Sequence, residues 1–214
     1  MDRQEYLSRW SDLHGGASNA GLVGIWLRLA YVLARPLARI GTGPNTVTVA
    51  GLLVALTAVP VAAPGGRWPL LAALVVGLSG LLDNLDGAVA VLTGRATRWG
   101  AVLDSFCDRV ADAGYGVALW LVGAPGWLAV LAGGVTGLQE YLRARAAAGG
   151  MAEVGVVTVS ERPTRVIVTA MFLLAAGVYP GSAPAWAAAG TAVWAGLGTV
   201  GLVQLTRQVR RLLT

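Results

Sequence analysis

Four aspartates interrupt a long apolar part of the sequence and constrain the fold more than any other feature. Asp83 and Asp86 are three residues apart, and Asp104 and Asp108 are four apart. Each pair therefore shares one face if its segment is helical. The polar, glycine-containing stretch 92–99 lies midway between the pairs and is typical of a turn. An antiparallel helical hairpin would then bring all four carboxylates together.

Such a cluster of carboxylates predicts a cation site. Unpaired ionised groups in hydrocarbon are costly, and four close carboxylates would repel one another. One or two divalent cations remove that cost, and oxygen-only ligation suits Mg²⁺, Mn²⁺ or Ca²⁺ better than zinc. Cys107 and His14 are the only cysteine and histidine, so they form no competing zinc site. We expect two ions of Mg²⁺ or Mn²⁺.

Composition places these carboxylates in a membrane protein. The 214 residues are 56% hydrophobic and only 13% charged, which leaves too few polar groups to cover a soluble domain. The net charge of +5 indicates positive-inside loops and contact with membrane lipids rather than with nucleic acid. Residues 1–20 lack the apolar core of a cleavable signal peptide.

The expected fold class is an all-α integral membrane protein with six transmembrane helices. It divides into a polar leader, an interfacial amphipathic helix and a six-helix membrane catalytic domain, which are residues 1–20, 21–43 and 44–214. Arg28, Arg35 and Arg39 align on one face of the second part, and Pro36 shortens its apolar run. A helix lying in the membrane interface therefore fits better there than a span.

The six expected spans are apolar segments separated by polar breaks or by breaks rich in proline and glycine, at residues 47–63, 70–92, 100–123, 127–147, 166–179 and 185–205. With this count, every arginine except Arg67 falls on one side. The positive-inside rule makes that side cytoplasmic. We therefore expect a multi-pass protein of the cell membrane, with both termini and the active site facing the cytoplasm.

The aspartates also carry a family resemblance. The pattern D-x2-D-G-x2-A and the later G-x3-D-x3-D are formed by Asp83, Asp86, Gly87, Ala90, Gly100, Asp104 and Asp108. This pattern resembles the signature of the CDP-alcohol phosphotransferases, also called CDP-alcohol phosphatidyltransferases. One position departs, because Val91 stands where the family usually has arginine. That change weakens charge stabilisation unless Arg95 or Arg98 reaches in from the loop.

The resemblance implies roles for named residues. Asp83, Asp86, Asp104 and Asp108 would bind metal, and Asp108 would also be the catalytic base that deprotonates the acceptor hydroxyl. Nucleotide or CDP-lipid contacts would come from small or polar residues, namely Asn45, Thr46, Thr48, Asp83, Gly87, Ala90, Thr97 and Gly100. Helix packing is the alternative role for the small residues Gly87, Ala90 and Gly100, and Asn45 or Thr46 also suits a helix cap. Asp112, one turn further on, stands outside the motif, and we expect it to orient a ligand or Arg109 or to serve helix packing.

Three arginines predict where an acceptor phosphate binds. Arg162 and Arg165 stand in the first turn of an expected helix, where the macrodipole disfavours cations, so a bound anion would explain them. Arg143, at the end of the preceding span, can reach the same place. The segments Y-x-R-A-R-A and S-E-R-P-x-R resemble the acceptor region of phosphatidylinositol phosphate synthases. Ordinary positive-inside arginines facing lipid headgroups are the alternative.

The resemblance thus implies an enzyme of phospholipid biosynthesis, and a homodimer. It would transfer a phosphatidyl group from a CDP-alcohol such as CDP-diacylglycerol to a small phosphorylated alcohol, with inositol phosphate favoured, and release CMP. A phosphatidylglycerophosphate synthase using glycerol phosphate is the rival within the family. A cation transporter, suggested by intramembrane carboxylates, and a silent CDP-lipid binder, suggested by Val91, are the alternatives outside it.

Overall fold

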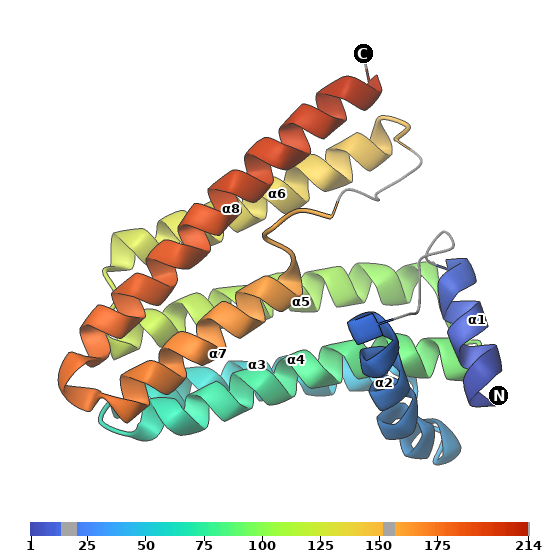
Figure 1. Ribbon diagram of the computed structural model, residues 1–214, viewed down its shortest axis with the longest axis horizontal. Coiled ribbons are helices and arrows are strands. Elements are labelled where there is room, and N and C mark those ends of the chain that lie inside the picture. The colour runs from blue at the N-terminus through green and yellow to red at the C-terminus, as the bar shows by residue number, and fades with distance from the viewer. Residues whose placement is uncertain (14–20, 152–156, 214) are drawn as a thin grey trace. The chain divides into compact units, whose positions relative to one another are not determined.

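The computed structural model describes residues 1–13, 21–151 and 157–213, which contain helices and no strand (Figure 1). The all-α prediction is confirmed for this part. The elements are α1 (Arg3–Leu13), α2 (Gly21–Arg39), α3 (Pro44–Ala62), α4 (Trp68–Thr93), α5 (Arg98–Val122), α6 (Gly126–Ala148), α7 (Arg162–Val178), the short 3₁₀ helix η1 (Pro180–Ser182) and α8 (Ala183–Leu213). Residues 14–20 of the expected leader, including His14, lie outside the described residues.

The chain forms two compact units. The first unit comprises Met1–Leu53 and Ser79–Cys107, and the second comprises Val54–Leu78 and Asp108–Thr214. Helices α3, α4 and α5 each contribute one part to the first unit and the other part to the second. The two units are therefore built from continuous helices and are described one at a time.

In the first unit, α1 forms where the sequence indicated only a polar leader. Asp2 caps this helix, because its Oδ1 accepts a hydrogen bond of 2.9 Å from the N–H of Glu5. Tyr6 is 1% exposed and packs on Tyr31 of α2, with the ring centroids 5.4 Å apart. Burial of one aromatic side chain thus stabilises a helix whose own composition is polar.

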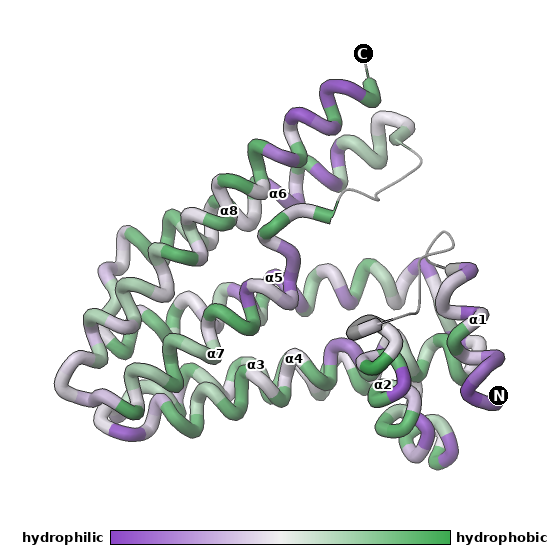
Figure 2. Tube along the Cα trace, viewed as in Figure 1, coloured by the Kyte–Doolittle hydropathy of each residue, from purple (hydrophilic) through white to green (hydrophobic). Residues whose placement is uncertain are grey.

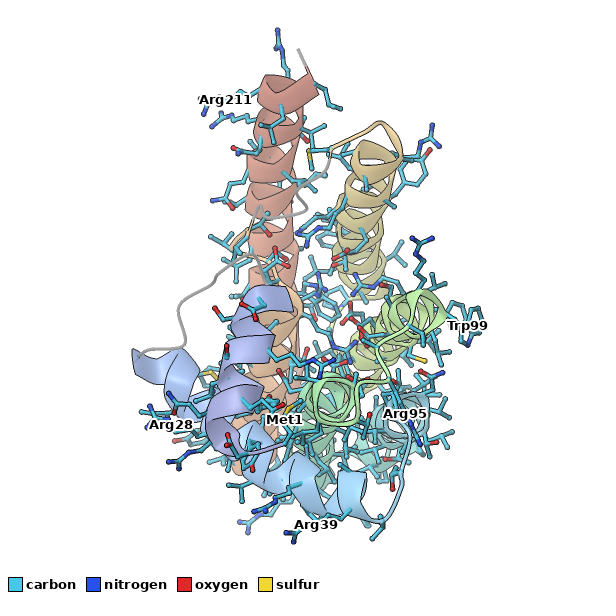
Figure 3. The ribbon with its side chains drawn as sticks, turned by 90° about the vertical axis from the view of Figure 1, so that its right-hand side faces the viewer. Met1, Arg28, Arg39, Arg95, Trp99 and Arg211 are labelled. Atoms are coloured by element: carbon cyan, nitrogen blue, oxygen red, sulfur yellow. The ribbon has the colours of Figure 1, made fainter. Side chains whose placement is uncertain are left out.

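Helix α2 has two apolar faces. One is buried with α4 residues in the core of the first unit and carries Leu27, Ala30, Tyr31 and Ala34. The other is exposed and carries Ile25, Leu29 and Val32. Arg28 and Arg39 project outward from the helix (Figure 3). An exposed apolar face flanked by arginines suits a membrane interface, although that location stays a prediction.

Three helical segments are long and apolar enough to cross a membrane: α3, α4 and Pro180–Leu213, which includes α8 (Figure 2). The six helices expected after residue 44 are all present, but the six-span count stays a prediction. Their starts and ends differ from the expected spans by a few residues, except that α8 continues to Leu213. Arginines near the C-terminus of a helix do not stop it, because they complement the helix dipole.

Glycine allows close helix packing in the second unit, where α8 packs against both α6 and α7 (Figure 1). At Gly190 of α8, an added Cβ would lie 2.5 Å from Cβ of Phe172 on α7. At Gly177 of α7, it would lie 2.6 Å from the backbone nitrogen of Leu70. Small residues at such contacts are typical of helices that pack in membranes.

Candidate metal and substrate site

The turn between α4 and α5 sets the position of the aspartate-bearing helices. Gly94 adopts φ +66°, and the Arg95 N–H donates a hydrogen bond of 3.1 Å to the Ala90 carbonyl, which is a glycine-dependent helix ending. Thr97 then caps α5, since its hydroxyl oxygen accepts a hydrogen bond of 2.9 Å from the Gly100 N–H. The sequence pattern predicted this hairpin correctly.

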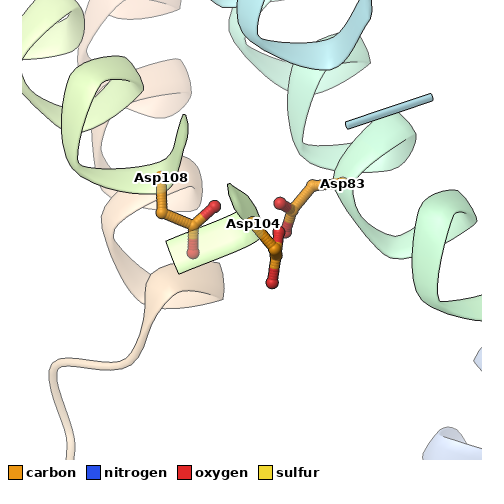
Figure 4. Close-up of side chains that lie close together, drawn as sticks. All are labelled: Asp83, Asp104 and Asp108. Carbon is orange, nitrogen blue, oxygen red and sulfur yellow. The ribbon is translucent and has the colours of Figure 1, made fainter. Parts of the chain in front are cut away.

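Three of the four motif aspartates converge (Figure 4). Asp83 of α4 and Asp104 and Asp108 of α5 each offer a carboxylate oxygen, and these oxygens lie within 4.8 Å of one another. Asp104 and Asp108 are one turn apart on a continuous stretch of α5, so they share a face. All three side chains are half-buried. Hard oxygen donors at this spacing fit a divalent cation such as Mg²⁺ or Mn²⁺.

Asp86 lies outside that three-carboxylate group. One Asp86 oxygen accepts a hydrogen bond of 2.6 Å from the hydroxyl of Thr48. Both side chains are buried, with 6% and 7% exposure. The structure thus places Asp86 one helical turn beyond Asp83 and anchors it to α3, and its role as a metal ligand stays a prediction.

A cavity of about 190 Å³ in the first unit gathers most of the predicted nucleotide-binding residues. Six of the eight line it: Asn45, Thr48, Gly87, Ala90, Thr97 and Gly100. Thr46 and Asp83 are absent from its lining residues, whereas Asp86 and Asp104 are present. Helix α3 begins at Pro44, so Asn45 and Thr46 lie inside its first turn rather than at the cap position.

The two motif glycines have different surroundings. A Cβ at Gly100 would lie 3.1 Å from both the side-chain oxygen of Asn45 and the hydroxyl oxygen of Thr97, so glycine allows these three residues to pack closely. A Cβ at Gly87 would meet nothing within 4 Å. Gly87 therefore leaves the cavity wall open, while Gly100 serves local packing.

The three arginines predicted for the acceptor phosphate lie in the second unit, and each pairs with a carboxylate. The pairs are Arg143 with Glu161 at 2.9 Å, Arg162 with Asp108, and Arg165 with Asp112 at 3.2 Å. Arg165 is 2% exposed, and its Nη1 also donates to the Ser160 carbonyl at 3.0 Å. These pairs join the start of α7 to α5 and α6.

Glu161 fixes the segment that leads into α7. Its Oε1 accepts hydrogen bonds of 2.8 Å from both the N–H and the hydroxyl of Thr158, and its carboxylate pairs with Arg143. Burial by itself raises the pKa of Glu161, but hydrogen bonds from Arg143 and Thr158 outweigh burial and leave the pKa below its usual value. Glu161 is therefore ionised at neutral pH.

Arg109 and Glu140 are two further members of this network that sequence reasoning did not assign to the site. Nη1 of Arg109 lies 3.0 Å from Oε1 of Glu140, and its Nη2 lies 3.3 Å from Asp112. The latter contact agrees with the expected orienting role of Asp112. One sequence pattern could have indicated Glu140. It stands three residues before Arg143, and opposite charges at this spacing meet on one helix face.

The sequence is similar to enzymes that make inositol phospholipids. It is 34% identical over 197 residues to a phosphatidylinositol phosphate synthase from Mycobacteroides abscessus, covering 87% of this chain and 84% of that protein. It is 36% identical over 158 residues to an archaetidylinositol phosphate synthase from Aeropyrum pernix, covering 71% of this chain and 76% of that protein.

Solved structures agree with these relatives. The fold is similar to Mycobacterium tuberculosis phosphatidylinositol phosphate synthase with CDP-DAG bound, at a TM-score of 0.70 and 28% identity, over 85% of this chain and 94% of that one. The same enzyme in complex with manganese and citrate gives a TM-score of 0.68 at 29% identity, over 85% and 88% of the two chains. Residues 41–200 match the CDP-alcohol phosphatidyltransferases, and the chain therefore belongs to this family as a membrane-bound transferase of substituted phosphate groups in phospholipid biosynthesis.

Proposed function

We propose that this enzyme transfers a phosphatidyl group from CDP-diacylglycerol to a hydroxyl of inositol phosphate and releases CMP. The observation that carries the proposal is the carboxylate group of Asp83, Asp104 and Asp108, one member of which, Asp104, also lines the cavity of the first unit. Relatives named phosphatidylinositol phosphate synthase support the choice of acceptor.

The cavity would hold the nucleotide end of the donor. Its lining residues include hydroxyl and amide side chains from Asn45, Thr48 and Thr97, which suit hydrogen bonds to a polar headgroup. The open wall at Gly87 lets the donor approach the backbone of α4. The acyl chains would stay in the bilayer beside the apolar helices α3 and α4.

Asp83, Asp104 and Asp108 would hold the metal, and Asp86 would join them as a fourth ligand. Mg²⁺ or Mn²⁺, as two ions, would neutralise charge on the donor diphosphate and on the transferring phosphoryl group. The protein contributes to metal binding by holding the carboxylates at a fixed spacing. It does so by placing Asp104 and Asp108 on one face of α5 and by anchoring Asp86 to Thr48.

Asp108 would act as the general base. Its carboxylate takes the proton of the acceptor hydroxyl while the oxygen forms a bond to the lipid-linked phosphorus, and the bond from that phosphorus to CMP breaks. Arg162 pairs with Asp108 and would keep this carboxylate oriented. Asp108 is therefore both a member of the three-carboxylate group and the partner of an arginine.

Arg143, Arg162 and Arg165 would bind the phosphate of the acceptor. Their side chains are 20%, 13% and 2% exposed, respectively, so solvent reaches Arg143 and Arg162 more readily than Arg165. We assign direct phosphate contacts first to the two more accessible arginines. Arg165 would contribute mainly through its positive charge, because its nitrogens already contact Asp112, Glu140 and Ser160.

The proposed cellular arrangement follows from the arginine distribution. The enzyme would lie in the cell membrane, with six spans, the interfacial helix α2, and both termini and the active site on the cytoplasmic side. The homodimer is proposed from the family resemblance alone. Three helical segments with the length and composition of membrane spans support an integral location. Residues outside the membrane domain would then meet lipid headgroups through their arginines.

The direct test is CMP release by purified protein in detergent, with CDP-diacylglycerol, Mg²⁺ or Mn²⁺, and a panel of alcohols. We expect turnover with inositol phosphate and little with unphosphorylated inositol or glycerol phosphate. Preferential turnover with glycerol phosphate would instead favour the phosphatidylglycerophosphate synthase alternative. The Asp108→Asn variant serves as the inactive control, and its circular dichroism should match that of the parent protein.

A further inference from the structure

Arg95 gives the cavity of the first unit a positive charge. The cavity has two acidic side chains in its wall, those of Asp86 and Asp104. Among the described residues that line it, Arg95 is the one cation. An anionic group that entered this cavity would be repelled by the carboxylates unless cations offset them. The guanidinium of Arg95 is the protein group that can offset the negative charge of the two carboxylates.

The turn holds Arg95 at this place. Gly94 takes a left-handed conformation with φ +66°, and the Arg95 N–H donates to the Ala90 carbonyl, so the backbone at Arg95 is fixed at the end of α4. The Arg95 residue is exposed and is marked on the α4–α5 turn in Figure 3. A fixed backbone with a long, solvated side chain allows the guanidinium to reach a ligand at the cavity mouth.

The residue at position 91 does not supply a positive charge to the cavity. Val91 is 6% exposed and belongs to the apolar core that α2 and α4 share. Arg98, the other arginine of the turn, is absent from the lining residues of the cavity. Of the two turn arginines, Arg95 is therefore the one that lies at this cavity.

We propose that Arg95 binds the diphosphate of the CDP-linked donor, an inference that rests on the proposed function. A guanidinium presents two parallel N–H donors that match a phosphate edge, and it carries a positive charge that complements the phosphate. This contact would act on donor binding. It would have no direct effect on the acceptor, whose proposed arginines lie on α6 and α7.

The experiment compares Arg95→Ala with Arg98→Ala, two exposed arginines of one turn. Binding of free CDP is measured by calorimetry with Mg²⁺ present, and the KM for each substrate is measured by CMP release. We expect Arg95→Ala to weaken CDP binding and to raise the donor KM by about tenfold, because the variant loses one charge-assisted contact. Arg98→Ala should stay within about twofold of the parent protein, and Arg95→Lys should recover part of the loss.

Four other results would overturn the assignment. Equal effects of Arg95→Ala and Arg98→Ala would indicate general charge attraction, and a change in the acceptor KM alone would place Arg95 with the acceptor. Unchanged CDP binding by Arg95→Ala, in a protein that still turns over CDP-diacylglycerol, would refute this inference and leave the proposed function standing. A parent protein that neither binds CDP nor releases CMP would refute both.

Discussion

Nε of Arg165 lies 3.2 Å from Oδ2 of Asp112, and both side chains are almost fully removed from solvent, at 2% and 4% exposure. This buried ion pair links the first turn of α7 to the middle of α5. Removing one partner of a buried pair leaves an uncompensated charge, whereas replacing both by apolar residues often costs little.

Asp112→Asn should therefore lower stability in detergent by about 3 kcal/mol, seen as a lower midpoint of thermal unfolding. The double variant Asp112→Leu/Arg165→Met should unfold at a higher temperature than Asp112→Asn alone. If the double variant is instead the less stable of the two, the ion pair contributes more stability than two apolar side chains would, which contradicts this prediction.

The hydrogen bond from Thr48 to Asp86 should strengthen metal binding. The Thr48 hydroxyl donates a hydrogen bond of 2.6 Å to Asp86 in a buried setting, and Thr48→Val keeps the shape while removing the donor. We expect the Mg²⁺ concentration for half-maximal CMP release to rise about tenfold. Thr48→Ser is the matched control and should behave like the parent protein. An unchanged metal requirement in Thr48→Val would argue that Asp86 contacts no metal.

Removal of divalent metal should abolish CMP release. Excess chelator is expected to stop turnover, and added Mg²⁺ or Mn²⁺ should restore it, because the oxygens of Asp83, Asp104 and Asp108 form a hard donor set. Asp104→Asn should raise the metal requirement by more than about tenfold, whereas Asp12→Asn, an exposed site on α1, should not. Full activity in chelator would exclude a metal role for the three carboxylates.

The Glu161 contacts should make stability sensitive to acid. The folded-state pKa of Glu161 lies below its ordinary value of 4.5, so ionised Glu161 stabilises the fold. That stabilisation is complete above pH 4.5 and is lost as the pH falls through the lower, folded-state pKa. Thermal unfolding followed from pH 7 downward should show a steeper loss in the parent protein than in Glu161→Gln. Parallel curves for the two proteins would contradict this.

Arg162 should act on the acceptor more than on the donor. Its side chain is 13% exposed and pairs with Asp108, and loss of one charged phosphate contact should raise the acceptor KM about tenfold or more. We expect Arg162→Ala to leave the donor KM within about threefold. Arg207→Ala, in the last turns of α8, is the control for lipid headgroup contacts. Equal changes for both substrates would favour the headgroup interpretation of these arginines.

The family, the helical class and the aspartate hairpin were readable from the sequence because each depends on local spacing. Aspartates three and four residues apart must share a face of a helix, and Gly94 must end α4 where it does. The family match over residues 41–200 confirms the transferase prediction. The helix at Arg3–Leu13 was missed, since its stability comes from Tyr6 packing on a distant part of the chain.

The sequence by itself determined which residues lie on the same side of each helix, such as Asp104 and Asp108 on α5. Only the tertiary structure decided which members meet. It left Asp86 outside the group that the other three aspartates form, placed Arg95 rather than Arg98 in the cavity wall, and brought Glu140 to Arg109. Spacing within a helix follows from its fixed 3.6-residue turn, whereas contacts between helices depend on the side chains packed between them.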